Sequence, residues 1–207
     1  MTHRHRSAWI AAAFIPVLLL TSACSSSGTK KSTGGRSPGS SIGPNPNATE
    51  SAPPGDIPDN QAFVVYAAPK HAFSVKFPEG WAMTRSGLAV LFTDKYNSIR
   101  IETRPAASRP TVASATAMEL PTVKAAAQGF VPGDVKTVQR TVGQAVLVTY
   151  RADSAPNAVT GKVALEAVER YEFWRSGPEV VLTLSAPVGS DNVDPWRKVT
   201  DSFGWKA

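Results

Sequence analysis

The chain has 207 residues, of which 42% are hydrophobic, 8% aromatic and 18% charged, and its formal net charge is +6. This length suits one domain with additional segments, because a single core usually organises ~100 to 200 residues, and it excludes a large multidomain enzyme. One cysteine excludes an intramolecular disulfide and a cysteine-rich zinc module. Three histidines, two of them at positions 3 and 5, are too few for a histidine metal cluster.

The amino terminus has the pattern of an export signal. Arg4 and Arg6 precede an apolar stretch over residues 8–20 that only Pro16 interrupts. As a helix this stretch is roughly 20 Å long, shorter than the roughly 30 Å hydrocarbon core of a bilayer. Residues 1–23 are therefore predicted to be a signal peptide.

The run Leu20-Thr21-Ser22-Ala23-Cys24 resembles a bacterial lipobox, although Thr21 stands where Leu, Val or Ile is usual. The resemblance implies that the Cys24 thiol receives a diacylglyceryl group and that signal peptidase II cuts before Cys24. Two or more acyl chains hold a protein stably on a bilayer, so we expect a lipoprotein on the extracytoplasmic face of the cell membrane. The alternative is a soluble secreted protein cut at an A-x-A-like site, with Cys24 incidental.

Residues 24–60 are expected to form a disordered tether. From Ser25 to Asn60 the chain is almost entirely Ser, Gly, Pro, Thr and Asn, with Ile42 and Ile57 as the only large apolar residues. Such a composition cannot bury enough apolar area to offset the entropy of ordering. The tether contains a G-x-S-x-G match at residues 35–39, but the hydrolase elbow needs a preceding strand and a following helix, which this segment lacks.

Period-two alternation of apolar and polar residues dominates residues 61–207, which we expect to form one domain. One apolar and one polar face on each strand is typical of an antiparallel sheet covered on a single side. The 17 basic and 13 acidic side chains are interspersed, which indicates a solvated mixed surface and no nucleic-acid partner. The predicted strands are residues 73–77, 81–83, 88–92, 99–101, 135–140, 144–150, 163–174 and 180–186.

The clearest hairpin joins residues 163–174 to residues 180–186 through a turn at residues 175–178. In its first strand Tyr171 and Phe173 alternate with Arg170 and Glu172, which are predicted to face solvent. Val163 and Leu165 fall on the apolar side with Tyr171 and Phe173, and Lys162 and Glu166 fall on the polar side. Glu169 also falls on the apolar side, which predicts either a β-bulge or a partnered carboxylate.

Two segments have helical patterns. Residues 113–128 are rich in Ala and end before Gly129, a glycine placed like a helix C-cap, and Pro121 predicts two short helices or one bent helix. Near the carboxyl terminus, Asp194 is the predicted N-cap of a helix on which Trp196, Val199 and Phe203 share one face.

The stretch from Phe73 to Trp81, an aromatic strand leading into Pro-x-Gly-Trp, resembles the opening of the PsbP-like superfamily. The Asp-Pro-Trp helix that finishes in Ser202-Phe203-x-Trp205 is similar to its ending. The resemblance covers residues 61–207 and implies an α+β fold with a central antiparallel sheet packed by helices, an α/β/α sandwich. The superfamily includes photosystem extrinsic subunits, Ran-binding Mog-type proteins and tethered actinobacterial lipoproteins of the LpqN type, and the composition here is compatible with the last group. The resemblance implies no shared active site.

No residue pattern indicates catalysis, cofactor binding or metal binding. His71 has no second histidine or cysteine near it in the sequence, and it is interpreted as a surface residue. The acidic residues of the last strands and helix are interpreted as a solvated face or as caps. Trp81 and Trp196 are predicted in the core, whereas Trp174 is left open between core and surface. The acidic residues in question are Glu166, Glu169, Glu172, Asp191, Asp194 and Asp201.

These observations favour a non-enzymatic lipoprotein that contacts the bilayer through acylated Cys24 and binds a protein or a cell-envelope component. Two alternatives stay open. A carrier of lipid or another apolar ligand predicts an apolar cavity of ~300 Å³ or more between sheet and helix. A cell-envelope hydrolase predicts two buried carboxyl groups ~5 to 10 Å apart in a cleft.

Overall fold

The computed structural model describes residues 55–69, 72–157 and 159–206. The signal peptide, Cys24, most of the tether and His71 lie outside the described residues. None of the described helices is both long and apolar enough to cross a bilayer.

The main sheet has seven antiparallel strands in the order β3-β4-β5-β9-β8-β7-β6. Strand β9 is central and has buried residues on both faces, so neither face of the sheet is simply solvated. The strand bounds are β3 Ala82–Ser86, β4 Ala89–Asp94, β5 Asn97–Pro105, β6 Val131–Arg140, β7 Gly143–Asp153, β8 Leu165–Trp174 and β9 Pro178–Pro187.

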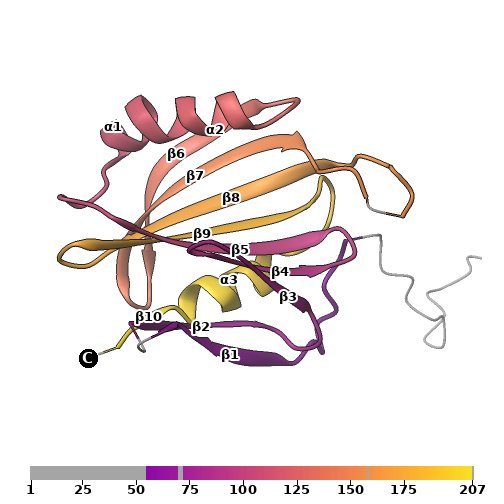
Figure 1. Cartoon of the computed structure of the whole chain (residues 1–207), viewed down its shortest axis with the longest axis horizontal. Coiled ribbons are helices and arrows are strands. Elements are labelled where there is room, and N and C mark those ends of the chain that lie inside the picture. Colours follow the sequence, from indigo (N-terminus) through magenta and orange to yellow (C-terminus); the bar gives the residue numbers. More distant parts are fainter. Residues whose placement is uncertain (1–54, 70–71, 158, 207) are drawn as a thin grey trace, which may run out of the picture. The chain divides into compact units, whose positions relative to one another are not determined.

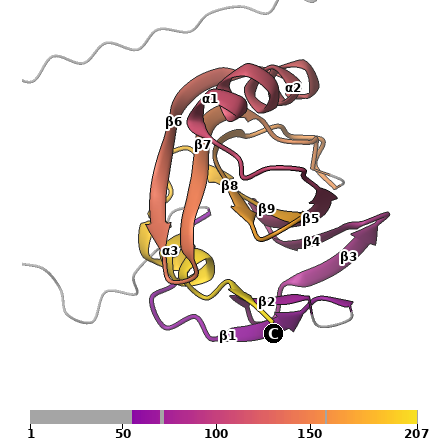
Figure 2. The same ribbon diagram turned by 90° about the vertical axis from the view of Figure 1, so that its left-hand side faces the viewer.

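A small second sheet lies on one side of the main sheet (Figure 1). In it, β2 (Phe73–Pro78) pairs on one edge with β1 (Phe63–Ala67) and on the other with β10 (Gly204–Trp205). Helix α3 (Val193–Asp201) lies between the two sheets (Figure 2). The apolar face that the sequence pattern predicts for α3 is confirmed for Trp196 and Val199, which are buried, whereas Phe203 is buried but lies beyond the end of the helix.

The opposite face of the main sheet is covered by a helical segment, residues 112–126 (Figures 1 and 2). It consists of α1 (Val112–Ser114), a π-helical turn (Ala115–Glu119) and α2 (Leu120–Ala126). Proline lacks an N–H group, and in a regular α-helix its ring clashes with the carbonyl four residues earlier. The wider π-turn directly before Pro121 relieves this clash. Of the two forms expected at Pro121, two short helices or one bent helix, the structure has one continuous helical segment that contains a π-turn.

The main core lies between the two sheets and is strongly aromatic. Phe173 stacks on Phe203 with ring centroids 4.3 Å apart, and Phe77 stacks on Phe92 at 4.0 Å. Trp81 and Trp196, both predicted in the core, are buried and meet edge to face at 6.3 Å. A smaller apolar cluster joins the helical segment to strands β6 and β7, with members Ala115, Val146 and Val148.

The predicted strands are confirmed, with differences at their ends. Strand β1 and the two-residue β10 were not predicted, and both are edge strands of the small sheet. Leu88 lies in the turn between β3 and β4 and is 83% exposed, so it does not share the buried face of Val90 and Phe92 as predicted. Val163 precedes β8 and is also exposed.

The hairpin turn at residues 175–178 is confirmed. Strand β8 ends at Trp174 and β9 begins at Pro178, and Ser176 and Gly177 between them have positive φ angles of 43° and 118°. Positive φ at both central residues is the requirement of a hairpin turn that follows the right-handed twist of its strands.

Two predicted helix ends are wrong. The N-cap of α3 is Asn192, and Asp194 lies within the first turn, where its carboxylate still faces the positive end of the helix dipole. The segment 112–126 ends at Ala126 with an extended cap residue, Ala127. Gly129 lies in the turn that follows, with φ +60°, and a Cβ there would come within 2.6 Å of the Asp153 carboxylate.

Residues 55–57, which the sequence pattern places in the tether, pack against the domain, whereas residues 58–60 are exposed. Asn192 accepts a hydrogen bond from the Ile57 backbone N–H at 2.8 Å and donates one to the Gly55 carbonyl at 2.8 Å. The Ile57 side chain is 5% exposed and belongs to the main core. Asn192 therefore anchors the start of the domain instead of capping its own helix with its side chain.

Candidate functional site

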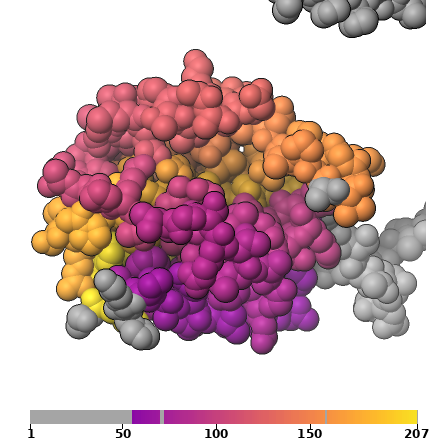
Figure 3. Space-filling view, viewed as in Figure 1, coloured from indigo at the N-terminus to yellow at the C-terminus, as the bar shows by residue number. Residues whose placement is uncertain are grey.

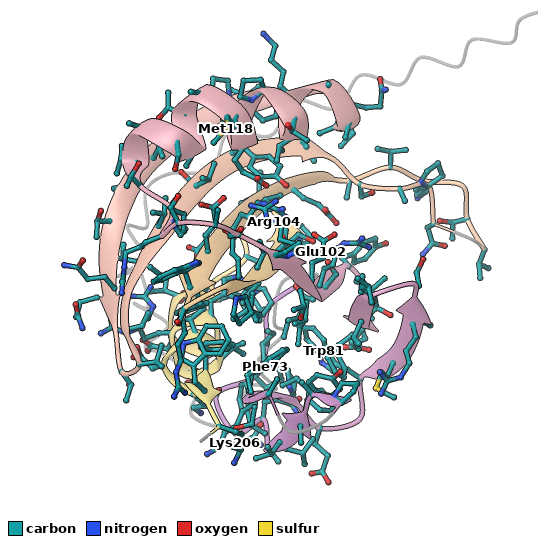
Figure 4. The ribbon with its side chains drawn as sticks, turned by 60° about the vertical axis from the view of Figure 1, so that its left-hand side comes forward. Phe73, Trp81, Glu102, Arg104, Met118 and Lys206 are labelled. Carbon is teal, nitrogen blue, oxygen red and sulfur yellow. The ribbon has the colours of Figure 1, made fainter. Side chains whose placement is uncertain are left out.

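The helix-facing side of the main sheet carries a cluster of charged side chains. Three strands (β5, β8 and β9) and the helical segment contribute to it, so its members come together only in the tertiary structure. Figure 4 shows Glu102 and Arg104 on this side, below the helical segment that carries Met118, whereas Phe73 and Trp81 lie in the aromatic core. We call this set the charge cluster; its members are Glu102, Arg104, Glu119, Arg170, Glu172 and Glu179.

Arg104 binds three carboxylates. Its cross-strand neighbour is Glu179, and it donates to both oxygens of that carboxylate, from Nε at 2.7 Å and from Nη2 at 3.2 Å. Nη2 also lies 2.8 Å from Glu119 Oε2 and 3.4 Å from Glu172 Oε1. Burial alone would lower the pKa of Arg104, but the hydrogen bonds to Glu179 and Glu119 outweigh burial and raise it. The guanidinium therefore stays charged.

Arg170 is the second cation of the cluster and is almost fully buried. Its Nε donates to Glu119 Oε1, and its Nη1 donates to Glu102 Oε2 at 3.3 Å and to Thr183 Oγ1 at 2.7 Å. Glu119 is the last residue of the π-turn, so its two oxygens tie the helical segment to both arginines of the sheet.

The carboxylates of the cluster differ in their pKa values. Burial would raise the pKa of Glu102, but the hydrogen bond from Arg100 and the charge of Arg170 lower it overall. The pKa of Glu172 is raised to about 7 by burial and by the charges of Glu179 and Glu119, against the opposing effect of Arg104. Glu172 therefore changes charge near neutral pH.

A polar cleft of about 380 Å³ opens beside the cluster. Glu119, Glu172 and Glu179 line it together with Arg104 and Arg109. Figure 3 shows this face hollowed between the helical segment and strands β4 and β5. The carboxylates in the cleft are each bound to a guanidinium, an arrangement that restrains them as structural ion pairs.

The prediction that the polar side of β8 faces solvent is wrong for two residues. Arg170 and Glu172 are buried because the helical segment covers their side of the sheet. Glu166 is half-buried, and burial raises its pKa although a hydrogen bond with Ser185 opposes the shift. Glu169 is a partnered carboxylate without a bulge: it accepts a 2.7 Å hydrogen bond from the Tyr171 hydroxyl, and the register of β8 is unbroken.

The second candidate site is an apolar groove of about 510 Å³ between the small sheet and the main sheet. Its walls include five core residues that are less than 8% exposed, and Leu88 lies at the groove with 83% exposure. Figure 4 shows one wall residue, Phe73, in the space between the two sheets. The buried wall residues are Tyr66, Ala68, Phe73, Val90 and Ile101.

Trp174, left open by the sequence, is half-buried at the end of β8. Its Nε1 donates to the Ala106 carbonyl at 3.2 Å, and the Arg109 guanidinium lies 5.4 Å from its ring centroid. The ring therefore supports the loop after β5 that forms the rim of the polar cleft. Among the described residues, no group of three or more His, Cys, Asp or Glu side chains is placed to hold a metal ion.

No protein-family model matches the chain, and no curated protein sequence matches it. Similar folds are found among solved structures. Cyanobacterial PsbP (CyanoP) from Synechocystis sp. PCC 6803 has a TM-score of 0.51 at 14% identity, with 70% of this chain and 94% of that chain covered. The Ran-binding protein Mog1p of Saccharomyces cerevisiae has a TM-score of 0.50 at 9% identity, with 70% and 96% covered.

Two further structures are more distant. LpqN of Mycobacterium tuberculosis, described as involved in cell envelope biogenesis, has a TM-score of 0.41 at 14% identity, with 72% of this chain and 87% of that chain covered. A Bacteroides thetaiotaomicron protein has a TM-score of 0.46 at 13% identity, with 69% of this chain covered, and this chain spans 48% of its length. The antiparallel sheets packed by helices, together with the similarity to CyanoP and Mog1p, establish that the chain has a PsbP-like α+β fold.

Proposed function

We propose that the chain is a lipid-anchored extracytoplasmic protein that binds an envelope component without transforming it, and that the apolar part of this ligand enters the apolar groove. The observation that carries the proposal is the groove itself, whose walls are core residues of both sheets. The lipobox-like run ending in Cys24 supports the anchoring. The fold supports binding by analogy alone: Mog1p, with a similar fold, is a Ran-binding protein.

The groove has the size and chemistry of a small-molecule site. Ligand pockets typically have volumes of about 300 to 1,000 Å³ and mainly apolar walls with a few polar groups. The groove has a volume of about 510 Å³ and is apolar, and the charged residues that line it within the described ranges are Arg85 and Arg104. It lies between the two sheets and not between sheet and helix, where an apolar carrier was expected to hold its ligand. Of the binding functions that the sequence left open, the groove favours an apolar ligand over a protein partner.

A hydrolase is the second candidate, because Glu119, Glu172 and Glu179 line one cleft. All three carboxylates contact Arg104 within 3.4 Å, which ties them to a cation instead of leaving one as a free general base. Glu172, with its pKa near 7, is the residue that this function would require as an acid. Release of products from cell-wall material by the parent chain, abolished in Glu172→Gln, would establish the hydrolase in place of the binding protein.

Filling the groove should abolish binding of an uncharged apolar fluorophore such as N-phenyl-1-naphthylamine. Thr103 lines the groove from strand β5. The substitution Thr103→Phe fills part of the groove with an aromatic ring, and phenylalanine is well tolerated in β-strands. We expect saturable fluorescence enhancement with the unacylated Cys24→Ala chain and a loss of at least about tenfold in affinity when Thr103→Phe is added.

Thr84→Phe is the matched control, because Thr84 is exposed on β3 and does not line the groove. This control should bind the fluorophore like the parent, and all three proteins should have the same circular dichroism spectrum. Equal binding by the Thr103→Phe and Thr84→Phe variants would contradict the assignment of the groove as the binding site.

Replacing Cys24 should release the chain from the membrane. The parent chain is expected to partition into the detergent phase after Triton X-114 separation, because acyl chains contribute ~0.8 kcal/mol per buried methylene. The Cys24→Ala chain should appear in the aqueous phase or keep an uncleaved signal peptide. Mass spectrometry of the mature parent should find a diacylglyceryl group on the Cys24 sulfur, and an unmodified thiol would contradict the anchoring.

A further inference from the structure

One wall of the apolar groove carries a positive charge that no carboxylate in the described part of the chain neutralises. Arg85 lies on the exposed edge strand β3, and its guanidinium carbon is 5.8 Å from the ring centroid of Tyr66, a groove residue. Among the described residues, Arg85 takes part in no ion pair, and the Tyr66 ring is its electrostatic partner. The contact with the aromatic ring restrains the position of the guanidinium. It does not use the N–H groups of the guanidinium, which can still donate hydrogen bonds to a ligand.

The other cation at the groove differs from Arg85. Arg104 also lines the groove, but its N–H groups are directed to Glu119, Glu172 and Glu179 on the far side of the main sheet. Its charge is thus already compensated by three carboxylates. Among the charged side chains that the structure describes at the groove, Arg85 is therefore the one whose charge a ligand meets without a carboxylate partner.

We propose that the groove binds an amphiphile with an acyl chain and a single anionic group, and that Arg85 binds the anionic group as the chain lies against Tyr66, Val90 and Ile101. This inference rests on the proposed function and adds the class of ligand to it. A guanidinium forms paired hydrogen bonds with carboxylate or phosphate oxygens, so Arg85 can bind an amphiphile that carries either anionic group. The apolar walls contribute affinity, and Arg85 contributes the preference for an anion.

The exposed Leu88 fits this arrangement. It lies in the turn that follows Arg85, at the groove, and its side chain is 83% exposed. A bound chain that crosses this turn covers Leu88 and removes its apolar surface from water, which favours binding. The anionic group would then lie near solvent at Arg85, where a charged group retains part of its hydration.

The test compares dodecanoate with methyl dodecanoate as competitors of N-phenyl-1-naphthylamine on the Cys24→Ala chain at pH 8, below the micelle concentration. We expect dodecanoate to bind about tenfold more tightly than its ester, as a charge-assisted hydrogen bond allows. Dodecyl phosphate should bind like dodecanoate. Within the ester series, affinity should rise about fourfold per methylene until the groove is filled.

Arg85→Gln should remove the preference for the acid and leave the affinity for the ester unchanged. Arg151→Gln is the matched control, because Arg151 is an exposed strand arginine that does not line the groove. Equal affinities of acid and ester in the parent, or an equal loss for both in Arg85→Gln, would overturn the anionic assignment while the groove remains a binding site. Failure of every competitor and fluorophore to bind would instead overturn the proposed function.

Discussion

Replacing Arg170 with Met is expected to lower the free energy of unfolding by roughly 3 kcal/mol or more. The Arg170 side chain is 11% exposed, and it donates hydrogen bonds to Glu119, Glu102 and Thr183. Its loss leaves carboxylates in a buried setting with one cation in place of two, and the desolvation cost of those carboxylates is then no longer offset. The helical segment should loosen first, because Glu119 is its ionic attachment to the sheet.

The double variant Arg170→Met/Glu119→Leu should recover much of the lost stability, since an apolar pair of similar volume often replaces a buried ion pair without loss. Arg197→Met is the matched control, because Arg197 is 61% exposed and pairs with Asp201 on the surface of α3; it should leave the unfolding midpoint unchanged. Urea unfolding followed by circular dichroism measures all three. A double variant as unstable as Arg170→Met would show that the ion pairs themselves, and not the unpaired charge, determine the stability of this region.

Replacing Glu172 with Gln is expected to stabilise the protein above neutral pH. The pKa of Glu172 is about 7 in the folded chain, against an ordinary value of 4.5, so the folded state binds the proton more tightly than the unfolded state. Stability from this group is therefore fully present below about pH 4.5 and is lost as the pH rises through about 7. Gln resembles the protonated carboxyl, so the variant does not undergo this loss.

The advantage of Glu172→Gln over the parent should be larger at pH 8 than at pH 5 by roughly 2 kcal/mol. Denaturant unfolding of both proteins at a series of pH values measures the difference. Both proteins share every other residue, so the difference between them reports the replacement at position 172. An advantage that is independent of pH would mean that Glu172 is already ionised at pH 5, with Arg104 outweighing burial and the two neighbouring carboxylates.

The charge cluster and the apolar groove lie on opposite faces of strand β5, and Arg104 contributes to the walls of both the cleft and the groove. The cluster attaches the helical segment to the sheet, whereas the groove reaches the aromatic core. The two sites can therefore be tested separately. Substitutions in the cluster are expected to change stability, and substitutions in the groove are expected to change ligand binding.

Patterns among neighbouring residues were sufficient to predict the strands of the main sheet, the turn at Ser176 and Gly177, and the apolar face of α3. Alternation with period two, positive φ in a two-residue turn and helical spacing are local properties, so the sequence alone expresses them. The aromatic motif from Phe73 to Trp81 and the ending at Trp205 likewise sufficed for the PsbP-like fold. The same local rules misplaced the N-cap of α3. The cap residue is Asn192, and its side chain is hydrogen-bonded to the backbone of Gly55 and Ile57, far away along the chain.

Only the tertiary structure decided where the polar faces of the strands lie. Arg170 and Glu172 alternate with apolar residues as a solvated strand face does, and nothing near them in the sequence shows that residues 112–126 cover that face. Glu119 lies 51 residues from Arg170, and Arg104 lies 75 residues from Glu179, so each pairing depends on strand order and on the π-turn before Pro121. The groove has the same origin: its walls come from two sheets, and the volume between two sheets is a property of their packing and not of any single segment.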